Sequence, residues 1–534
     1  MGKLGLYART IRRMKLTQVV GRLHRTRIVD ANGTPRLTDG FSIVLRDTDL
    51  ADNYLERFDV DLLVKSNTLL LLNSAYVVDS EAWQIPEASH LWNFNLHYFE
   101  YAIALGEAFR KTQNNDYWMK FKSLVTSWIG CCKYAQGDAW HPYTISLRLV
   151  NWLVCRDLFK ANIKEDEAFD ALMQNSMYLQ YRHLLANQEK HLLANHYLEN
   201  LKTLVICALL FGEDDVLAEI ERNYLAQLDE QVLPDGVHYE RSMMYHKLLL
   251  EGVLRVELAY RSAGKVAPAK VASKARQMLD AMASIERGMG KTPFFNDAAD
   301  GVAKECKSLI CACRDVYGYE PDDTKTAFSD SGFYKLYDGN VALVFFAGEP
   351  GPQYMLGHAH CDLLSFELSV GDRPVIVNSG TYAYQSDLRS YFRSTAAHNT
   401  ATVDGEEQME CWAEHRVARG VSRVRVEALG EHRIEASFRN YKGHLHRRSI
   451  ELRDGALRIE DATDRERAEV TQRYHFAKEE APAIAHGAGS KIGYSKAPSS
   501  PEFGKLAEIT VAEVFGAKSA CSTVFLSSFD GGDC

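Results

Sequence analysis

The segment Ile450-Glu-Leu-Arg-Asp-Gly-Ala-Leu-Arg-Ile459 gives the clearest local signal in this chain. Apolar and charged residues alternate on both sides of Asp454-Gly455, and such a dipeptide is typical of a two-residue turn between antiparallel strands. The period of two recurs at Val421–Val426, and Val341–Ala347 has the composition of a buried strand. We therefore expect an antiparallel β-sandwich over residues 325–534.

Upstream of this region, apolar residues recur at helical spacing. Examples are Leu201, Leu204, Val205 and Leu209. Turn-forming stretches such as Pro234-Asp235-Gly236 separate the helical runs, and a succession of helical hairpins predicts a toroid or solenoid. We assign residues 91–324 to this (α/α) toroid and interpret residues 1–90 as a basic arm and packing segment. The whole chain is then a multidomain α+β protein.

Composition excludes some classes of function. The net charge of −9 over 534 residues gives no overall basic field, which argues against nucleic-acid binding. The eleven cysteines contain no CxxC pair, as expected for free thiols in a reducing compartment. No apolar run of about 18 residues exists, so we expect no transmembrane segment. No apolar signal-peptide region follows the basic start, so we expect a cytoplasmic protein.

Seven lysine and arginine residues lie between Arg9 and Arg27, interleaved with short apolar pairs. Such a stretch is most often a solvated arm or a helix packed on the protein body. The alternative is peripheral contact with an anionic membrane surface. The sequence favours no particular oligomeric state.

Two clusters in the helical region combine polar and aromatic residues. Trp140-His-Pro-Tyr143, followed by Arg148, can form the floor of a sugar groove, because sugars stack on rings and bind planar polar groups; the alternative is a helix start packed by its aromatic rings. Asn195-His196 lies within an apolar helix, where polar side chains either find hydrogen-bond partners or face a cleft.

A third cluster follows Asp235-Gly236. Glu240-Arg241-Ser242 and Tyr245-His246 lie three to four residues apart and can share a helix face. The alternative is a capped and salt-bridged helix start.

The fourth cluster contains three segments: Gly357-His-Ala-His-Cys-Asp362, Asn378-Ser-Gly-Thr-Tyr382 and Arg393-Ser-Thr-Ala-Ala-His-Asn-Thr400. On a strand, His358 and His360 point to the same face. Together with His398 they predict a metal site or an acid–base site. The alternative is a pair of hydrogen-bonded structural histidines.

Together these clusters resemble the heparinase II/III family of polysaccharide lyases. The resemblance extends from about Trp92 to Gly405 and is strongest between Gly357 and Thr400. It implies an N-terminal (α/α) toroid, a C-terminal antiparallel β-sandwich and an active site in the cleft between them. It also implies β-elimination across C4–C5 of a uronic acid in an acidic polysaccharide.

The resemblance implies catalytic roles residue by residue. Asn195, assisted by His196, neutralises the uronate carboxylate so that the transition state can spread charge onto it. Tyr245 and His358 supply the base and the acid, in an order that depends on the C5 configuration. A tyrosine, with a pKa of about 10, acts as a base only when nearby groups lower that pKa, and Arg241, His246 and the histidine cluster are candidates. The expected substrate-binding residues are Trp140, Tyr143, Arg148, Arg241 and Arg393.

The resemblance further implies a structural divalent metal, most often zinc, held by His360, Asn378 and His398. The family pattern has an aspartate where this chain has Asn378, and a neutral amide is a poorer zinc ligand than a carboxylate. Two alternatives stay open: a site of two histidines completed by water or another side chain, and a metal-free site held by hydrogen bonds.

Three functions follow from these observations. The first is a lyase; the segment Leu91–Phe99 and the basic start resemble members that act in bacterial surface-polysaccharide metabolism. The second is a uronate C5-epimerase on the same fold, and the third is a non-catalytic glycan-binding protein. A hydrolase is disfavoured, because no pair of carboxylates stands out near these motifs. Glu240 and Asp362 are the nearest candidates, and either can instead orient a neighbour.

Overall fold

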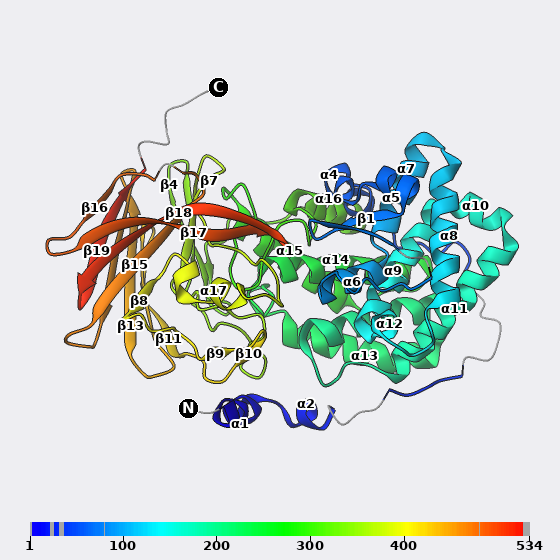
Figure 1. The fold of residues 1–534 in the computed structure, drawn as a ribbon, viewed down its shortest axis with the longest axis horizontal. Coiled ribbons are helices and arrows are strands. Elements are labelled where there is room, and N and C mark those ends of the chain that lie inside the picture. Colours follow the sequence, from blue (N-terminus) through cyan, green and yellow to red (C-terminus); the bar gives the residue numbers. More distant parts are fainter. Residues whose placement is uncertain (1–2, 22–25, 31–36, 79–80, 480, 527–534) are drawn as a thin grey trace.

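The computed structural model describes residues 3–21, 26–30, 37–78, 81–479 and 481–526. A helical domain is followed by an antiparallel β-sheet domain, and a short helical N-terminal segment runs along both (Figure 1). This arrangement confirms the expected fold class. Among the described helices, none combines the length and apolar character needed to cross a bilayer.

The described elements before residue 90 are short. They are α1 (Lys3–Arg13), α2 (Leu16–Gly21), α3 (Arg46–Asp49), α4 (Asp52–Leu55), the 3-10 turn η1 (Glu56–Phe58), α5 (Val60–Ser66), β1 (Thr68–Leu71) and β2 (Ser74–Val77). Residues 22–25, part of the basic start, lie outside the described residues.

The helical domain begins at α6 and ends with α16. Its elements are α6 (His90–Tyr98), α7 (Tyr101–Thr112), α8 (Asn115–Cys131), η2 (Asp138–Trp140), α9 (Pro142–Leu158), α10 (Lys160–Glu165), α11 (Glu167–Ala186), α12 (Ala194–Phe211), α13 (Asp214–Gln231), α14 (Met243–Ser262), α15 (Ala269–Glu286) and α16 (Cys306–Tyr317).

These helices form an incomplete ring that the N-terminal elements complete. Helices α7, α9, α12, α14 and α16 pack one against the next, while α8, α11, α13 and α15 pack outside them. Helix α3 contacts α16, and α4 and α5 contact α7. A buried ion pair fixes this closure, because Arg255 Nη1 of α14 donates to Asp49 Oδ2 of α3 at 2.9 Å.

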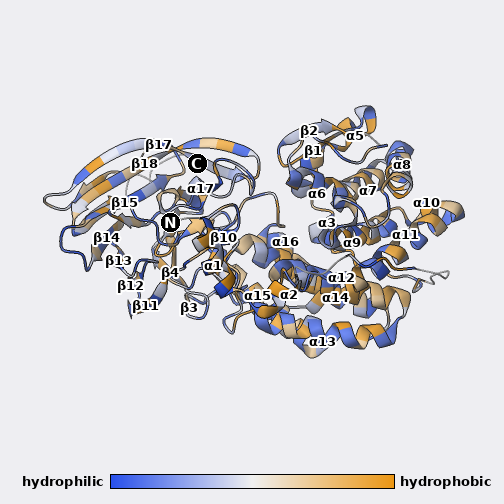
Figure 2. Ribbon diagram, turned by 60° about the horizontal axis from the view of Figure 1, so that its bottom comes forward, coloured by the Kyte–Doolittle hydropathy of each residue, from blue (hydrophilic) through white to orange (hydrophobic). Residues whose placement is uncertain are grey.

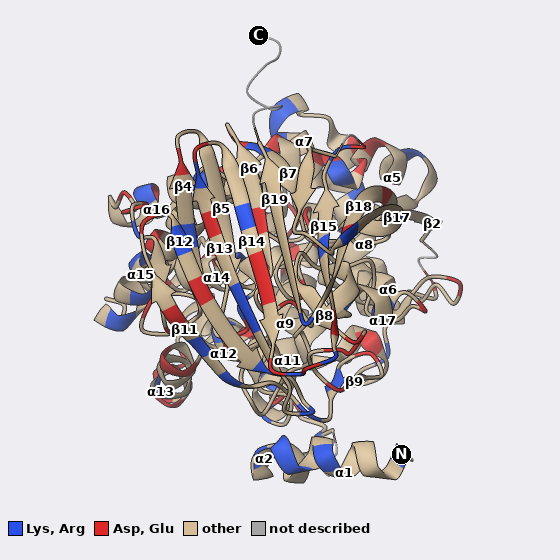
Figure 3. Ribbon diagram, turned by 90° about the vertical axis from the view of Figure 1, so that its left-hand side faces the viewer, with Lys and Arg blue, Asp and Glu red and all other residues tan. Residues whose placement is uncertain are grey.

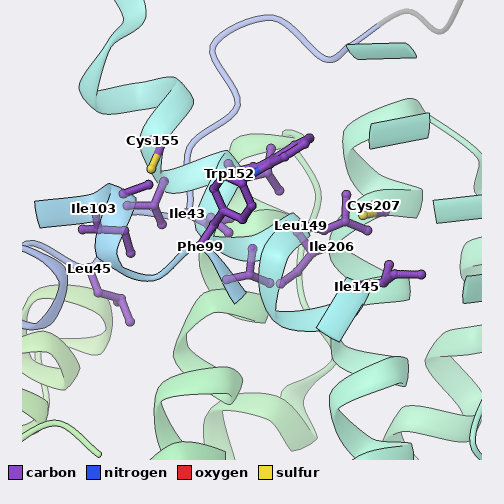
Figure 4. Packing of buried hydrophobic residues seen from close by; sticks show 14 of the residues in the cluster. Ile43, Leu45, Phe99, Ile103, Ile145, Leu149, Trp152, Cys155, Ile206 and Cys207 are labelled. Carbon is purple, nitrogen blue, oxygen red and sulfur yellow. The ribbon is translucent and has the colours of Figure 1, made fainter. Parts of the chain in front are cut away.

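Side-chain patterning explains the ring. Along α13, the buried residues Leu217, Ile220, Tyr224 and Leu228 are three or four positions apart, which gives that helix one apolar face (Figure 2). Figure 4 shows Trp152 beside Phe99, with Ile43 close by, inside the ring. The segment before α3 therefore contributes to the same core as the long helices.

The described part of the β domain contains two large sheets and a two-stranded sheet of β9 and β10. Its elements are β3 (Ala327–Phe328), β4 (Phe333–Asp338), β5 (Val341–Phe346), β6 (Phe366–Val370), β7 (Arg373–Ile376), α17 (Arg389–Phe392), η3 (Thr395–Ala397), β8 (Ala401–Val403), β9 (Cys411–Trp412), β10 (Arg416–Val417), β11 (Ser422–Leu429), β12 (Arg433–Arg439), β13 (Leu445–Arg453), β14 (Ala456–Thr463), β15 (Glu469–Phe476), β16 (Ile484–His486), β17 (Lys491–Glu502), β18 (Lys505–Ala517) and β19 (Ser519–Phe525).

One sheet has the order β11-β12-β13-β14-β19-β16, and the other has the order β17-β18-β15-β7-β6-β5-β4-β3, with β8 added to β15. Buried and exposed residues alternate along β13 and β14, and Figure 3 shows charged residues along these strands. The β13–β14 hairpin has the predicted register, with Arg453 opposite Ala456. Asp454 and Gly455 both have positive φ, at 54° and 68°, as a type I′ turn requires.

The two domains share an apolar core and polar contacts. Ile285, Met289 and Phe295, from the end of the helical domain, belong to the same buried cluster as β4 to β6. Asp235 Oδ2 accepts a hydrogen bond from Ser331 N at 2.7 Å, across the boundary between the domains. These contacts fix the relative position of the helix starts and the sandwich loops that carry the predicted motifs.

Candidate active site

The motifs predicted to be catalytic meet where two helices begin beside a loop of the sandwich. Asn195 and His196 lie in the first turn of α12, and Leu193 and Ala194 precede them with φ of 61° and 46°. Tyr245 lies in the first turn of α14, which Ser242 caps. Left-handed backbone at residues other than glycine costs free energy and is concentrated at functional sites. The positive φ values at Leu193 and Ala194 are therefore consistent with a functional role for the side chains of Asn195 and His196, which follow them.

Tyr245 and His358 are in direct contact. Their ring centroids lie 4.5 Å apart at an interplanar angle of 80°, an edge-to-face arrangement. The Tyr245 hydroxyl is 2.7 Å from the hydroxyl of Tyr384, whose ring lies 5.9 Å from that of His358. Burial raises the pKa of Tyr245 well above its usual value, and the neighbouring Tyr384 and Asp297 act in the same direction. Tyr245 is thus a neutral proton donor in the free protein.

Asp297 lies behind the histidines and is fully buried. Its Oδ2 is 3.2 Å from His358 Nδ1, and its Oδ1 is 2.9 Å from His360 Nε2. Arg389 donates to both oxygens, with Nη2 to Oδ2 at 2.8 Å. Burial opposes ionisation of Asp297, but Arg389 and the two imidazoles outweigh it and keep its pKa well below the usual value. Asp297 is therefore a buried carboxylate.

Glu240 is a second buried acid in this site. Within the described part of the chain, neither of its carboxylate oxygens has a hydrogen-bond partner. Burial raises the pKa of Glu240, against the opposing effect of the His358 and His196 imidazoles. Burial alone would lower the pKa of His358, but Glu240 and Asp297 outweigh it and raise that pKa. His358 therefore retains its proton to a higher pH than an ordinary histidine does.

Asn195 and His196 belong to a polar group that adjoins Glu240. Asn195 Nδ2 donates to the Tyr143 hydroxyl at 3.0 Å, and the Tyr143 and His196 rings lie 4.4 Å apart. His196 Nδ1 is 2.9 Å from Glu189 Oε1. Burial opposes ionisation of Glu189, but His196 and His141 outweigh it and lower its pKa. The anionic Glu189 fixes one edge of His196 and leaves Nε2 for a ligand.

The three expected metal ligands form a series of contacts and do not converge on one point. His360 Nδ1 lies 3.2 Å from His398 Nε2, and His398 Nδ1 lies 3.2 Å from Asn378 Oδ1. The amide oxygen is thus on the opposite edge of the His398 ring from His360. It also accepts from Ser365 Oγ at 2.8 Å. Two nitrogen atoms are close enough to share a cation, but Asn378 does not complete a three-ligand site.

The described residues also contain no group of three or more His, Cys, Asp or Glu side chains placed to hold a metal ion. Because His360, His398 and Asn378 do not converge, the residues present do not fit the zinc site that the resemblance implies.

Two family models match the chain. The model of the heparinase II/III N-terminus matches residues 65–326, and that of the heparinase II/III-like C-terminal domain matches residues 320–516. This chain belongs to the heparinase II/III family. No relative is found among curated protein sequences.

Solved structures of heparinases share the fold. A crystal structure of heparinase III aligns with a TM-score of 0.70 at 14% identity, covering 97% of this chain and 90% of that one. The heparan sulfate lyase HepC from Pedobacter heparinus aligns with a TM-score of 0.55 at 18% identity, covering 95% of this chain and 87% of that one. At these identities the likeness concerns the fold alone.

In this heparinase II/III family member, the four predicted substrate-binding residues other than Tyr143 lie in structural surroundings. Trp140 is buried against Trp128 and Tyr134. Arg148 donates to Gln180 and to the carbonyl oxygens of His97 and Ala139.

Arg241 and Arg393 are similarly occupied. Arg241 donates to the carbonyl oxygens of Tyr239 and Ser331, and Arg393 to those of Ala359 and Glu414. All four side chains are buried. Because their donors are satisfied within the protein, we do not include them in the substrate site.

Arg241 and His246 were expected to lower the pKa of Tyr245. His246 Nε2 lies 2.9 Å from the carbonyl oxygen of Met278, and its Nδ1 accepts from the main-chain amide of His238. Arg241 and His246 are therefore engaged elsewhere and do not lower the pKa of Tyr245. The groups that do surround it, Tyr384 and Asp297, raise that pKa.

Several site residues were not predicted. Asp297, Tyr384, His415 and Glu189 contact predicted residues in the structure, and Arg389 contacts Asp297. A usable signal exists for Asp297, because Asn296-Asp297 follows two phenylalanines and so places polar side chains next to a buried segment. Tyr384 and His415 carry no such signal, because they reach His358 from separate loops.

Proposed function

We propose that this chain is a polysaccharide lyase that cleaves a uronic-acid-containing acidic polysaccharide by β-elimination. The observation that carries the proposal is the edge contact between Tyr245 and His358. This contact brings the Tyr245 hydroxyl, which keeps its proton, beside the His358 imidazole, which can act as a base once it has lost its proton. A site that only binds glycans has no need for such a pair.

The first requirement of the reaction is to neutralise the uronate carboxylate, because a charged carboxylate opposes carbanion formation at C5. Asn195 offers an amide for this purpose, and His196 offers Nε2 on the edge away from Glu189. Preorganised donors of this kind stabilise developing charge without reorganisation cost.

The second requirement is proton transfer at C5 and O4. His358, with Nδ1 facing Asp297, presents Nε2 as the base once it is deprotonated. Tyr245, whose hydroxyl keeps its proton, donates to the departing O4. The opposite assignment requires a substrate that lowers the Tyr245 pKa.

A C5-epimerase would use the same proton abstraction but must return a proton to the opposite face of the sugar. Because Tyr245 and His358 contact each other edge to face, both would approach a bound sugar from the same direction, and this supports elimination over that alternative. We further propose that the substrate is a bacterial surface polysaccharide that the protein modifies.

Ultraviolet absorbance tests the proposal. Elimination creates a C4–C5 double bond conjugated to the carboxylate, which absorbs where the intact sugar does not. The purified protein is incubated with heparan sulfate, alginate and other uronate polymers, with Tyr245→Phe as the matched control. An increase in absorbance with one polymer that is lost in the variant supports the lyase. Solvent deuterium entering C5 without absorbance would instead support the epimerase and exclude the lyase.

A further inference from the structure

The N-terminal helices join the two domains beside the candidate active site. Arg9 Nη2 lies 2.9 Å from Glu410 Oε1, and Trp412 Nε1 donates to Thr10 Oγ1 at 3.0 Å, which attaches α1 to the sandwich. Lys15 Nζ lies 2.5 Å from Glu230 Oε1 of the helical domain. Figure 1 shows α1 and α2 along the lower side of both domains. The segment therefore bridges the two domains.

A cavity of about 130 Å³ lies between this segment and both domains. Arg13 and Tyr7 of α1 line it on one side, and His191, Tyr354, His415 and Arg416 line it on the other. No aspartate or glutamate is among its lining residues. Two arginines, two histidines and two tyrosines without a carboxylate form a surface that favours an anionic ligand with an apolar face.

The cavity adjoins the catalytic pair. Gly357, next to His358 in the chain, lines it. The His415 ring, another part of its wall, lies 5.8 Å from the His358 ring and 5.1 Å from the Tyr384 ring. A sugar bound here would therefore be a near neighbour of the sugar at Tyr245 and His358.

The two arginines have no carboxylate partner among the described residues. Arg13 donates to the carbonyl oxygen of Gln353 at 3.2 Å and to its side chain. The Arg416 guanidinium lies over the rings of Tyr7 and Trp412, at 5.0 and 4.9 Å. Stacking holds a guanidinium in place and leaves its in-plane donors for a carboxylate or sulfate.

The nearby carboxylates are already engaged. Glu410 binds Arg9 and Arg419, and Glu230 binds Lys15 and the Tyr354 hydroxyl. Glu349, whose charge acts on Arg13, accepts from the Gln353 side chain and does not line the cavity.

We propose that this cavity is a subsite for an anionic sugar residue, in which Arg13 and Arg416 bind the carboxylate or sulfate of the unit adjoining the one that reacts. The N-terminal helices thereby become part of the substrate-binding surface. The reaction assigned to the neighbouring unit rests on the proposed function, but binding at the subsite is measured independently of turnover.

Isothermal titration calorimetry on the full chain tests the subsite, with a heparan sulfate tetrasaccharide and an alginate tetrasaccharide as probes. Arg416→Gln removes the charge, and Arg416→Lys retains it. Arg13→Gln is a second charge-removing variant. Arg12→Gln is its matched control, because Arg12, like Arg13, belongs to α1, but it is exposed and does not line the cavity. A thermal melt of each variant reports its folding.

We expect Arg416→Gln and Arg13→Gln to weaken binding of at least one probe about tenfold, with Arg416→Lys in between and Arg12→Gln unchanged, because each charge-removing variant loses a charge-assisted hydrogen bond, and a tenfold loss corresponds to about 1.4 kcal/mol. Equal binding by the parent and both charge-removing variants would overturn the subsite, as would failure of the parent to bind either probe. Arginine-dependent binding without an unsaturated product would keep the subsite and count against the lyase. Formation of an unsaturated product, with probe binding unchanged in both arginine variants, would support the lyase and overturn the subsite.

Discussion

The Nδ1 atom of His358 lies 3.2 Å from Oδ2 of the fully buried Asp297. A carboxylate at this position favours the tautomer with the proton on Nδ1 and leaves Nε2 to exchange protons with a substrate. Asp297 also binds Arg389 and His360, so it holds His358, the proposed base, and the neighbouring histidine in one fixed arrangement.

We predict that Asp297→Asn lowers kcat/KM about 100-fold, within the range found for disrupted general acid–base catalysis. The variant removes a negative charge that raises the His358 pKa, so that pKa falls. If the neutral imidazole is the base, activity then begins to rise at a lower pH than in the parent. Initial rates measured over a series of pH values check both effects.

Asp362→Asn is the matched control for this variant. Asp362 is a buried acid in the loop between β5 and β6 that also carries His358. Its Oδ2 accepts a hydrogen bond from Asn296 N at 2.6 Å, and burial raises its pKa to about 7. It does not contact His358 directly, so its replacement should leave the pH dependence in place. A similar displacement of the pH profile in both variants would contradict a specific role for Asp297.

Glu240→Gln should separate stability from activity. Burial raises the folded-state pKa of Glu240, so the carboxyl group favours folding at acid pH and loses that contribution as pH rises through the folded pKa. The glutamine keeps the shape without the charge. We therefore expect the variant to gain stability over the parent at neutral pH, by about 1–3 kcal/mol, and to gain less at pH 4.

Urea unfolding at the two pH values measures that difference. The same variant removes a charge that raises the His358 pKa, so the acid limb of its kcat/KM profile should also move to lower pH. Glu240 would act here as a positioning residue. An unchanged profile, with the stability gain present, would show that Glu240 has no influence on the base.

The sequence was sufficient to predict the fold because the relevant signals are local. The Asp454-Gly455 turn and the alternation around it depend only on neighbouring residues, and the β13–β14 hairpin has the predicted register. Helical spacing around Leu201–Leu209 is likewise a local property, and α12 contains these residues. The place of α3 to α5 in the ring was not predicted, because it depends on a contact between Asp49 and Arg255, 206 residues apart.

The site was predicted only in part for the same reason. Tyr245 and His358 belong to motifs that can be recognised along the chain, and the structure brings them together. The arginines were assigned to substrate by residue type, but Arg148 and Arg393 lie where main-chain carbonyl oxygens need donors. Periodicity cannot distinguish an arginine that faces a cleft from one that satisfies buried carbonyls.

Tyr384→Phe should have a smaller effect than Tyr245→Phe. Removing the Tyr245 hydroxyl removes the proposed proton donor, and we expect kcat/KM to fall by a factor of about 10²–10⁴. Removing the Tyr384 hydroxyl deletes one hydrogen bond to Tyr245, at 2.7 Å, which is worth about 0.5–1.5 kcal/mol and hence about a factor of two to twelve. Initial rates on the polymer that the parent cleaves check the order. A Tyr384→Phe variant as inactive as Tyr245→Phe would identify Tyr384 as the donor instead.

The arrangement of His360, His398 and Asn378 leads to a prediction about metal content. Only two imidazole nitrogens approach each other, 3.2 Å apart, and the Asn378 oxygen lies at the far edge of the His398 ring. Structural zinc sites use four ligands, and a tight site is not expected from two. We therefore expect well below one zinc ion per chain by elemental analysis of carefully purified protein, and a melting temperature unchanged by a chelator.

His360→Ala provides the contrasting measurement. It should lower the melting temperature even without metal, because His398 Nε2 loses its buried partner and Asp297 Oδ1 loses one of its hydrogen bonds. The melting temperature of the variant alone does not therefore report a metal. The decisive comparison is the zinc content of parent and variant: one zinc ion per chain in the parent, lost in His360→Ala, would overturn the metal-free arrangement and establish a site built on the two histidines.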